Sequence, residues 1–168
     1  MKKAGSILPV CMHNNKLHFL FGKENELEPV ESQGWADFGG GCESGTPFQT
    51  ALREGKEEST GCLDTLELVK KGTYKLVLNK YHVFIVKMEY DPMLPLYYNR
   101  MHQFIIEKMP KLNKSVIFEK AEMAWFSVDA MIERREEFRG FYRHIVDLLV
   151  QHKPNIIRFI RSNKTKKN

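Results

Sequence analysis

The chain has 168 residues, which is the size of one ordinary domain with its own hydrophobic core. Hydrophobic residues make up 42% and charged residues 28%, and these proportions exclude a disordered or collagen-like protein. Lysine and arginine outnumber aspartate and glutamate by 26 to 21, so the formal charge is +5 and anionic partners are permitted. No stretch of the sequence has the roughly 20 consecutive apolar residues of a membrane span. The three cysteines are widely spaced, which indicates reduced thiols. We therefore expect a cytoplasmic protein without membrane association.

The start of the chain predicts a β-hairpin followed by a glycine loop. Two short, apolar, β-prone runs, 4–12 and 16–24, flank the turn sequence His-Asn-Asn at 13–15. The run Gly-Gly-Gly at 39–41 carries a conformational penalty in regular structure. It therefore predicts a loop whose backbone approaches another group.

The segment 47–60 predicts an amphipathic helix. Thr46 can act as its N-cap, and Pro47 fits the first helical position. Residues at spacings of three, four and seven form its predicted inner stripe: Phe48, Ala51, Leu52 and Gly55. A glycine inside a helix costs about 1 kcal/mol relative to alanine, so Gly55 predicts close packing by a neighbouring backbone.

The rest of the chain predicts further strands and helices. We expect strands over 66–78, 81–90 and 123–128, and helices over 97–109, 129–137 and 141–152. Pro154 is expected to end the last helix. The segment 91–115 is a long insertion between strands and a candidate for selecting substrate. We predict one domain, 1–161, and a basic C-terminal tail, 162–168.

A cluster of carboxylates lies on the predicted helix 47–60. In the sequence Arg-Glu-Gly-Lys-Glu-Glu, Glu54 shares a face with Glu57 and Glu58. Carboxylates on one face repel one another unless cations lie between them, and hard oxygen ligands suit Mg²⁺ or Mn²⁺. The alternative is a solvated acidic face. The preceding glycines favour the metal, because their N–H groups and the helix dipole can face a phosphate.

The segment GGGCESGTPFQTALREGKEESTGC, residues 39–62, resembles the box of the Nudix hydrolases, G-x5-E-x7-R-E-U-x-E-E-x-G-U with U a bulky aliphatic residue. The order of hairpin, helix, further strands and a late tryptophan-containing strand is similar to the whole Nudix fold over roughly 4–151. The resemblance implies an α/β protein with the Nudix α/β/α sandwich and a central mixed β-sheet. It also implies an acid anhydride hydrolase, a Nudix pyrophosphohydrolase.

The box departs from the family pattern at three positions. Gly45 stands where the box has a glutamate, and Glu43 is the available substitute. Gly55 replaces the aliphatic residue, and two residues separate Glu58 from Gly61 where the box has one. A box of this form is similar to a variant found in Nudix proteins of large DNA viruses.

The resemblance implies a role for each acidic residue of the box. Glu54, Glu57 and Glu58 would be the metal ligands and the catalytic base, with Glu58 the surest ligand. Arg53 would orient the glutamates through a salt bridge. The carbonyl oxygen of Gly40 is a further candidate ligand.

Family members often recruit one more acidic residue from the loop before the late tryptophan strand. Glu119 and Glu122 are the candidates here, and we favour Glu119. The alternative interpretation of Glu119 is a surface charge beside Lys120. For Glu122 we favour the interpretation as a surface charge over that as a metal ligand.

Substrate contacts are predicted from two kinds of residue. Gly39 and Gly41 can offer backbone N–H groups to phosphate. Trp35, Tyr97 and Tyr98 can stack on a base, although each is also a candidate core residue.

Three hypotheses about function follow. The first is a Mg²⁺- or Mn²⁺-dependent hydrolase that cleaves the pyrophosphate of a nucleoside diphosphate linked to another moiety, by attack of an activated water on phosphorus. The second assigns the same chemistry to capped mRNA or a diphosphoinositol polyphosphate. The third is a non-catalytic Nudix-fold module that binds nucleotide or RNA. Similar proteins are commonly homodimers, which we also take as an expectation.

Overall fold

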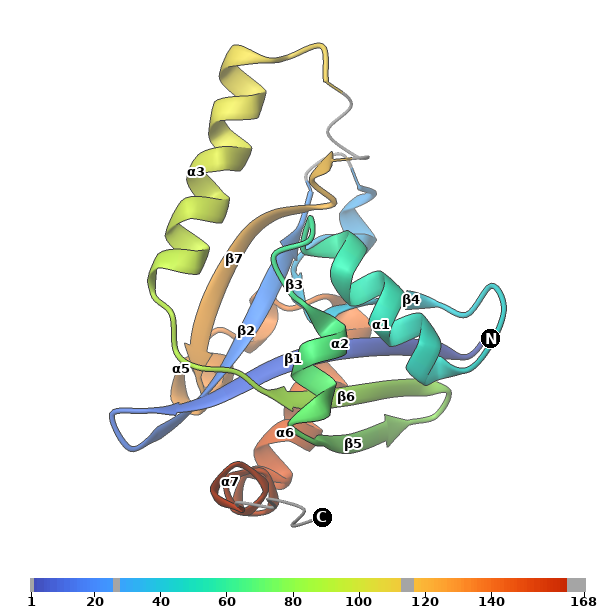
Figure 1. Ribbon diagram of the computed structural model, residues 1–168, viewed down its shortest axis with the longest axis vertical. Coiled ribbons are helices and arrows are strands. Elements are labelled where there is room, and N and C mark those ends of the chain that lie inside the picture. Colours follow the sequence, from blue (N-terminus) through green and yellow to red (C-terminus); the bar gives the residue numbers. More distant parts are fainter. Residues whose placement is uncertain (1, 26–27, 113–116, 163–168) are drawn as a thin grey trace.

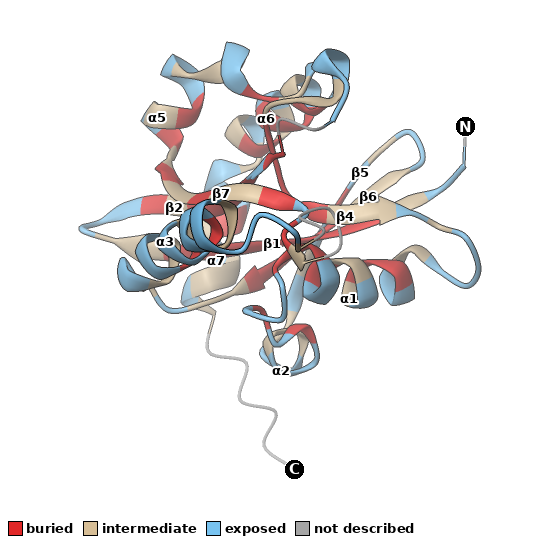
Figure 2. Cartoon of the chain, turned by 90° about the horizontal axis from the view of Figure 1, so that it is seen from above, coloured by how far each residue is buried: buried red, intermediate tan, exposed pale blue. Residues whose placement is uncertain are grey.

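The computed structural model describes residues 2–25, 28–112 and 117–162. An open, mixed seven-stranded sheet has the order β3-β2-β1-β6-β5, while β4 pairs with β1 and β7 pairs with β2. Helices lie on both sides of this sheet, as Figure 1 and Figure 2 show. The predicted α/β/α sandwich with a central mixed sheet is confirmed.

The predicted hairpin is present. Strands β1 (Ala4–His13) and β2 (Lys16–Glu24) pair antiparallel. Asn14 and Asn15 both have positive φ, 49° and 58°, which is the backbone of a two-residue hairpin turn of type I′. Asparagine tolerates this conformation better than most residues, so the turn sequence sets the register of the two strands.

The predicted glycine loop is wrong, because the glycines lie in a strand. Beyond their paired end, β1 and β2 separate, and β3 (Trp35–Ala36) pairs with β2 while β4 (Phe38–Gly41) pairs with β1. A Cβ on Gly39 would lie 2.3 Å from the Cβ of Ser6. The close approach to β1 and its ladder of hydrogen bonds therefore explain why the glycines adopt regular structure.

One face of the sheet carries helices that follow the glycine strand. These helices are α1 (Pro47–Glu58), α2 (Thr65–Lys70) and α3 (Met93–Lys108). The strand predicted over 66–78 is therefore wrong in its first half: Asp64 caps α2 by accepting the N–H of Glu67, and only β5 (Thr73–Leu78) is extended. A short 3-10 helix, η1 (Val30–Ser32), precedes β3.

The strands predicted later in the chain are present with shorter or longer bounds. β6 (Tyr81–Lys87) ends three residues before the predicted end, and β7 (Lys120–Ser127) begins three residues before the predicted start. Helix α3 starts at Met93 rather than at residue 97, because the Asp91 carboxylate accepts the N–H groups of Met93 and Leu94. The Asp91 side chain thus satisfies the first N–H groups of α3, and the helix begins earlier in the sequence than predicted.

The opposite face carries the C-terminal helices. They are α5 (Val128–Glu133), η2 (Arg135–Glu137), η3 (Gly140–Tyr142), α6 (Arg143–Gln151) and α7 (Lys153–Arg161). The helix predicted over 141–152 does end before Pro154, since α6 stops at Gln151. Pro154 also stands in the first turn of α7, a helix that the sequence did not predict, where its missing N–H has no partner to lose. The predicted tail lies outside the described residues, apart from Ser162.

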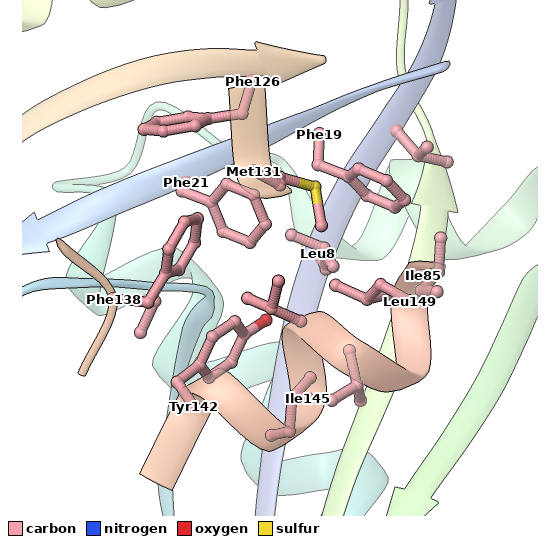
Figure 3. Close-up of a cluster of buried hydrophobic side chains, with 14 of the residues drawn as sticks. Leu8, Phe19, Phe21, Ile85, Phe126, Met131, Phe138, Tyr142, Ile145 and Leu149 are labelled. Carbon is pink, nitrogen blue, oxygen red and sulfur yellow. The ribbon is translucent and has the colours of Figure 1, made fainter. Parts of the chain in front are cut away.

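The larger hydrophobic core lies between the sheet and these C-terminal helices. Figure 3 shows its aromatic part, in which Phe21 contacts Phe126, Phe138 and Tyr142 edge-on.

Among the residues that the structure describes, none of the helices combines the length and apolar character needed to cross a bilayer. Cys11, Cys42 and Cys62 are free thiols.

Candidate functional site

The backbone of the glycine strand lies against the first carboxylate of α1. A Cβ built on Gly40 would lie 2.6 Å from the Cδ of Glu54, so only glycine leaves room for this carboxylate. The N–H of Gly39 donates a hydrogen bond of 2.7 Å to Oε2 of Glu58. The prediction that this backbone approaches another group is confirmed, and the groups are the carboxylates of Glu54 and Glu58.

Helix α1 begins as the sequence predicted, with one change in its packing. Thr46 and Gln49 form a capping box, and Pro47 stands in the first turn. Side chains rather than a backbone crowd Gly55, since a Cβ there would lie 3.0 Å from atoms of Ile7 and of Thr65. The expected neighbouring backbone was wrong, and the helix instead packs on the side chains of β1 and α2.

Two members of the predicted inner stripe are incompletely buried. Phe48 is 37% exposed and packs edge-on against Phe84, with ring centroids 5.0 Å apart. Leu52 is half-buried. Ala51 and Gly55 are buried as predicted, together with Thr50 and Glu58.

Arg53 contacts two of the α1 carboxylates. Its guanidinium lies 2.5 Å from Oε1 of Glu54 and 2.7 Å from Oε2 of Glu57. Both pairs are partly exposed to solvent, so each contributes little to stability. Their main consequence is geometric: one guanidinium holds two carboxylates in place.

Glu58 differs from the other α1 glutamates because it is buried, with 7% of its surface exposed. Burial raises its pKa to about 8, although Lys120 and the N–H of Gly39 both act to lower it. An ionised carboxylate here needs positive charge nearby. Part of that charge comes from the ammonium of Lys120, 3.3 Å from Oε2.

Sequence reasoning missed Glu24 and Lys120. Lys120 is 1% exposed and pairs with Glu24, at the end of β2, as well as with Glu58. The one available signal was Gly22, a glycine inside a strand. A Cβ there would lie 2.8 Å from Cγ of Lys120.

Glu119 lies on the loop that leads into β7, and charges of both signs act on it. Burial raises the pKa of Glu119, and Glu54, Glu57 and Glu24 raise it further, whereas Lys120 lowers it. Glu122, by contrast, raises the pKa of Arg134, which belongs to the opposite face of the sheet. The charges that act on Glu119 thus include those of the box, whereas Glu122 acts on a residue of the opposite face, and the preference for Glu119 as a ligand stays a prediction.

Two of the three aromatic residues proposed to stack on a base are in the core. Trp35 is 1% exposed and packs against Phe126, and Tyr98 is 3% exposed and donates its hydroxyl to the carbonyl of Lys120. Neither ring has a free face, so these two predictions are wrong. Tyr97 is exposed on α3.

The remaining candidates are two exposed residues before α1. Gly41 is exposed at the end of β4, and nothing lies within 4 Å of the position of its missing Cβ. Glu43, the substitute for the absent box glutamate, is exposed in the turn that follows.

The chemistry of the donors fits a hard divalent cation, although the side chains have not converged. Glu54, Glu57, Glu58 and Glu119 offer carboxylate oxygens, and the backbone of Gly40 lies against the carboxylate of Glu54. Within the described ranges, no three His, Cys, Asp or Glu side chains are already grouped closely enough to hold a metal.

No protein-family model and no curated protein matches the sequence. Solved structures do match. An Ap4A hydrolase of C. elegans in a binary complex has a TM-score of 0.54 at 15% identity, over 94% of this chain and 99% of that chain. The Nudix hydrolase RenU of M. smegmatis has a TM-score of 0.53 at 13% identity, over 92% and 88%. NrtR of Shewanella oneidensis, complexed with a 27mer DNA, has a TM-score of 0.50 at 10% identity, over 95% and 68%.

These likenesses show the fold: this chain has the fold of the Nudix hydrolases. Identities of this size carry no activity from one protein to another. The similarity of the box to a large-DNA-virus variant stays a prediction.

Proposed function

We propose that this protein is a divalent-metal-dependent Nudix pyrophosphohydrolase that cleaves a nucleoside diphosphate linked to another moiety. The observation that carries the proposal is the contact between the glycine strand and the carboxylates of α1: the N–H of Gly39 donates to Glu58, and Gly40 leaves room for Glu54. Like charges on one helix repel one another, so stability alone gives no reason to gather Glu54, Glu57 and Glu58 there. The fold shared with solved Nudix hydrolases supports the same assignment.

The chain's own groups would divide the work as follows. Glu54, Glu57, Glu58 and Glu119, with the carbonyl of Gly40, would hold Mg²⁺ or Mn²⁺. When bound, the cation supplies positive charge that polarises the pyrophosphate and makes water a better nucleophile.

Glu54 is the candidate base that accepts the proton of the attacking water, because Arg53 fixes its carboxylate beside Gly40. Arg53 is a positioning residue in this scheme. The N–H of Gly41 would face a phosphate oxygen, because this end of β4 is exposed. The N–H of Gly39, also predicted to contact phosphate, instead donates to Glu58.

The substrate class is proposed from the shape of the fold and the exposed side chains. One similar structure is named as an Ap4A hydrolase, and dinucleoside polyphosphates are nucleoside diphosphates linked to another moiety. Tyr97, exposed on α3, is the remaining candidate for stacking on a base. Capped RNA and diphosphoinositol polyphosphates contain the same type of bond, and we include them in the test. A cytoplasmic location and a homodimer belong to this proposal.

The test is release of phosphate-containing products from a substrate panel with Mg²⁺ or Mn²⁺. The panel contains nucleoside triphosphates, ADP-ribose, NADH, dinucleoside polyphosphates, diphosphoinositol phosphates and capped RNA. Wild type is compared with Glu58→Gln and with the control Glu67→Gln, an exposed glutamate of α2. We expect metal-dependent turnover that falls about 10²- to 10⁴-fold in Glu58→Gln and not in the control.

A non-catalytic binding module is the second candidate, and one observation favours it. Lys120 already pairs with Glu58, so part of the buried charge is balanced without a metal. NrtR, which has a similar fold, was crystallised with DNA. Absence of turnover on the whole panel, together with absence of Mn²⁺ binding by the folded wild type, would reject the hydrolase and leave this module.

A further inference from the structure

A buried network of charges lies beneath the carboxylates of the proposed metal site. Nζ of Lys120 is 2.5 Å from Oε1 of Glu24 and 3.3 Å from Oε2 of Glu58. The guanidinium of Arg139 lies 3.0 Å from the same oxygen of Glu24. The side chains of Lys120, Glu24 and Glu58 are 1%, 8% and 10% exposed. One ammonium thus connects β7, β2 and α1 away from solvent.

Stability is a weak explanation for this arrangement. Removing an ammonium and two carboxylates from water is expensive, and well-packed apolar side chains often serve a fold equally well. The carboxylates of Glu24 and Glu58 both lie within ion-pair distance of Nζ, and neighbouring carboxylates stabilise the charged form of a lysine. Lys120 therefore keeps its positive charge in the folded protein.

The contacts of Glu58 are confined to one of its two carboxylate oxygens. Oε2 accepts the N–H of Gly39 and lies next to Lys120. In the part of the chain that the structure describes, no hydrogen bond or ion pair reaches Oε1 of Glu58. One oxygen is held and the other is open to a ligand.

We infer that Lys120 is a fixed internal cation, which occupies the place between Glu24 and Glu58 that a divalent cation would otherwise take. This inference rests on the proposed function, in which Glu58 is a ligand of the divalent cation. Lys120 acts through Glu58, so it is a positioning residue. It limits both the number of divalent cations at the site and the affinity of Glu58 for them.

The direction of the effect follows from charge. An ammonium a few ångström from a carboxylate repels any second cation that approaches the same carboxylate, and burial strengthens the repulsion. Without Lys120, two carboxylates would face each other with Arg139 on one side only. Paired carboxylates are good ligands for Mn²⁺.

The experiment counts Mn²⁺ ions by the electron paramagnetic resonance signal of free Mn²⁺, on the full chain without substrate. Lys120→Met has a side chain of similar length without the charge. We expect it to bind one more Mn²⁺ per chain than wild type. Lys120→Arg keeps a cation and should bind the wild-type number. The matched control is Lys56→Met, which removes one exposed lysine from α1 itself and should also leave the number unchanged.

Lys120→Met leaves Glu24 and Glu58 facing each other, so this variant can fail to fold. The double variant Glu24→Gln/Lys120→Met removes one charge of each sign. It should keep the wild-type number of Mn²⁺ ions and bind them about tenfold more tightly or better, because the repelling ammonium is gone. Near-UV circular dichroism verifies folding before each titration.

Two outcomes overturn the inference. The first is that no folded variant without Lys120 binds an additional Mn²⁺ ion or binds Mn²⁺ more tightly than wild type. The second is that Lys56→Met produces the same gain as Lys120→Met, which would make the effect one of net charge. Failure of the proposed function is separate: a wild type that turns over no substrate, while Lys120→Met gains an ion, would reject the hydrolase and keep the internal cation.

Discussion

Two buried carboxylates lie near the glycine strand, and their surroundings differ. Asp37, between β3 and β4, accepts hydrogen bonds from three hydroxyls, those of Ser6 at 2.6 Å, Tyr81 at 2.5 Å and Tyr142 at 2.9 Å. Glu58 accepts one backbone N–H and pairs with an ammonium, and its other oxygen has no such contact within the described ranges. The first carboxylate is enclosed by donors, whereas the second is half open.

The difference predicts a structural role for Asp37 and a functional role for Glu58. The three donors of Asp37 come from β1, from β6 and from η3, so this residue joins elements at the point between β3, which pairs with β2, and β4, which pairs with β1. Burial raises the pKa of Asp37, and the hydroxyls oppose this rise. Glu58 joins fewer elements, keeps a ligand position open and lies beside other carboxylates. We therefore expect Asp37 to support the fold and Glu58 to support binding.

Removing the enclosed carboxylate should have the largest effect on stability. Asp37→Ala leaves three buried hydroxyls without their acceptor, at about 1–3 kcal/mol for each unsatisfied group, so we expect a loss of about 3 kcal/mol or more. Asp37→Asn retains an acceptor oxygen and should lose less. Urea unfolding measures both. The exposed control Asp129→Ala should change the free energy of unfolding by less than about 0.5 kcal/mol. An Asp37→Ala protein as stable as wild type would contradict the structural role.

Neutralising the open carboxylate should leave stability nearly unchanged. In Glu58→Gln the amide oxygen can still accept the N–H of Gly39, Lys120 keeps its pair with Glu24, and the cost of burying a charge disappears. We expect the free energy of unfolding at neutral pH to rise, or to fall by less than about 1 kcal/mol. Urea unfolding alongside Asp37→Ala gives the contrast. A loss as large as that of Asp37→Ala would make Glu58 structural as well.

The smallest expected effect concerns the glycines that approach the site. A Cβ at Gly40 pushes against the carboxylate of Glu54, while a Cβ at Gly41 meets nothing within 4 Å. We therefore expect Gly40→Ala to weaken Mn²⁺ binding about tenfold, as changes next to metal ligands commonly do. Gly41→Ala is the matched control and should bind as wild type does. Equal affinities in the two variants would mean that the contact of Gly40 with Glu54 has no bearing on the metal.

Local signals in the sequence predicted much of this fold. Asn14 and Asn15 identified the hairpin turn, and Thr46 with Pro47 identified the start of α1. Errors came where one residue type permits two structures. Pro154 can end a helix or begin one, and here it begins α7.

The errors at the site came from contacts between distant parts of the chain. The Gly39–Gly41 run forms a strand because β1 lies beside it. Trp35 and Tyr98 have the chemistry for stacking on a base, yet tertiary packing buries both rings. Lys120 has no local feature that distinguishes it from a surface lysine. Only the fold brings it to Glu24 and Glu58.

The central claim is that Glu119 and the carboxylates of α1 form one site for a divalent cation. The most direct test is the affinity for Mn²⁺ of Glu119→Gln and of Glu122→Gln, which differ by three positions and lie toward opposite faces of the sheet. We predict that Glu119→Gln weakens binding about tenfold or more, and that Glu122→Gln binds as wild type does. Wild-type affinity in Glu119→Gln, or weaker binding in Glu122→Gln alone, would contradict the account.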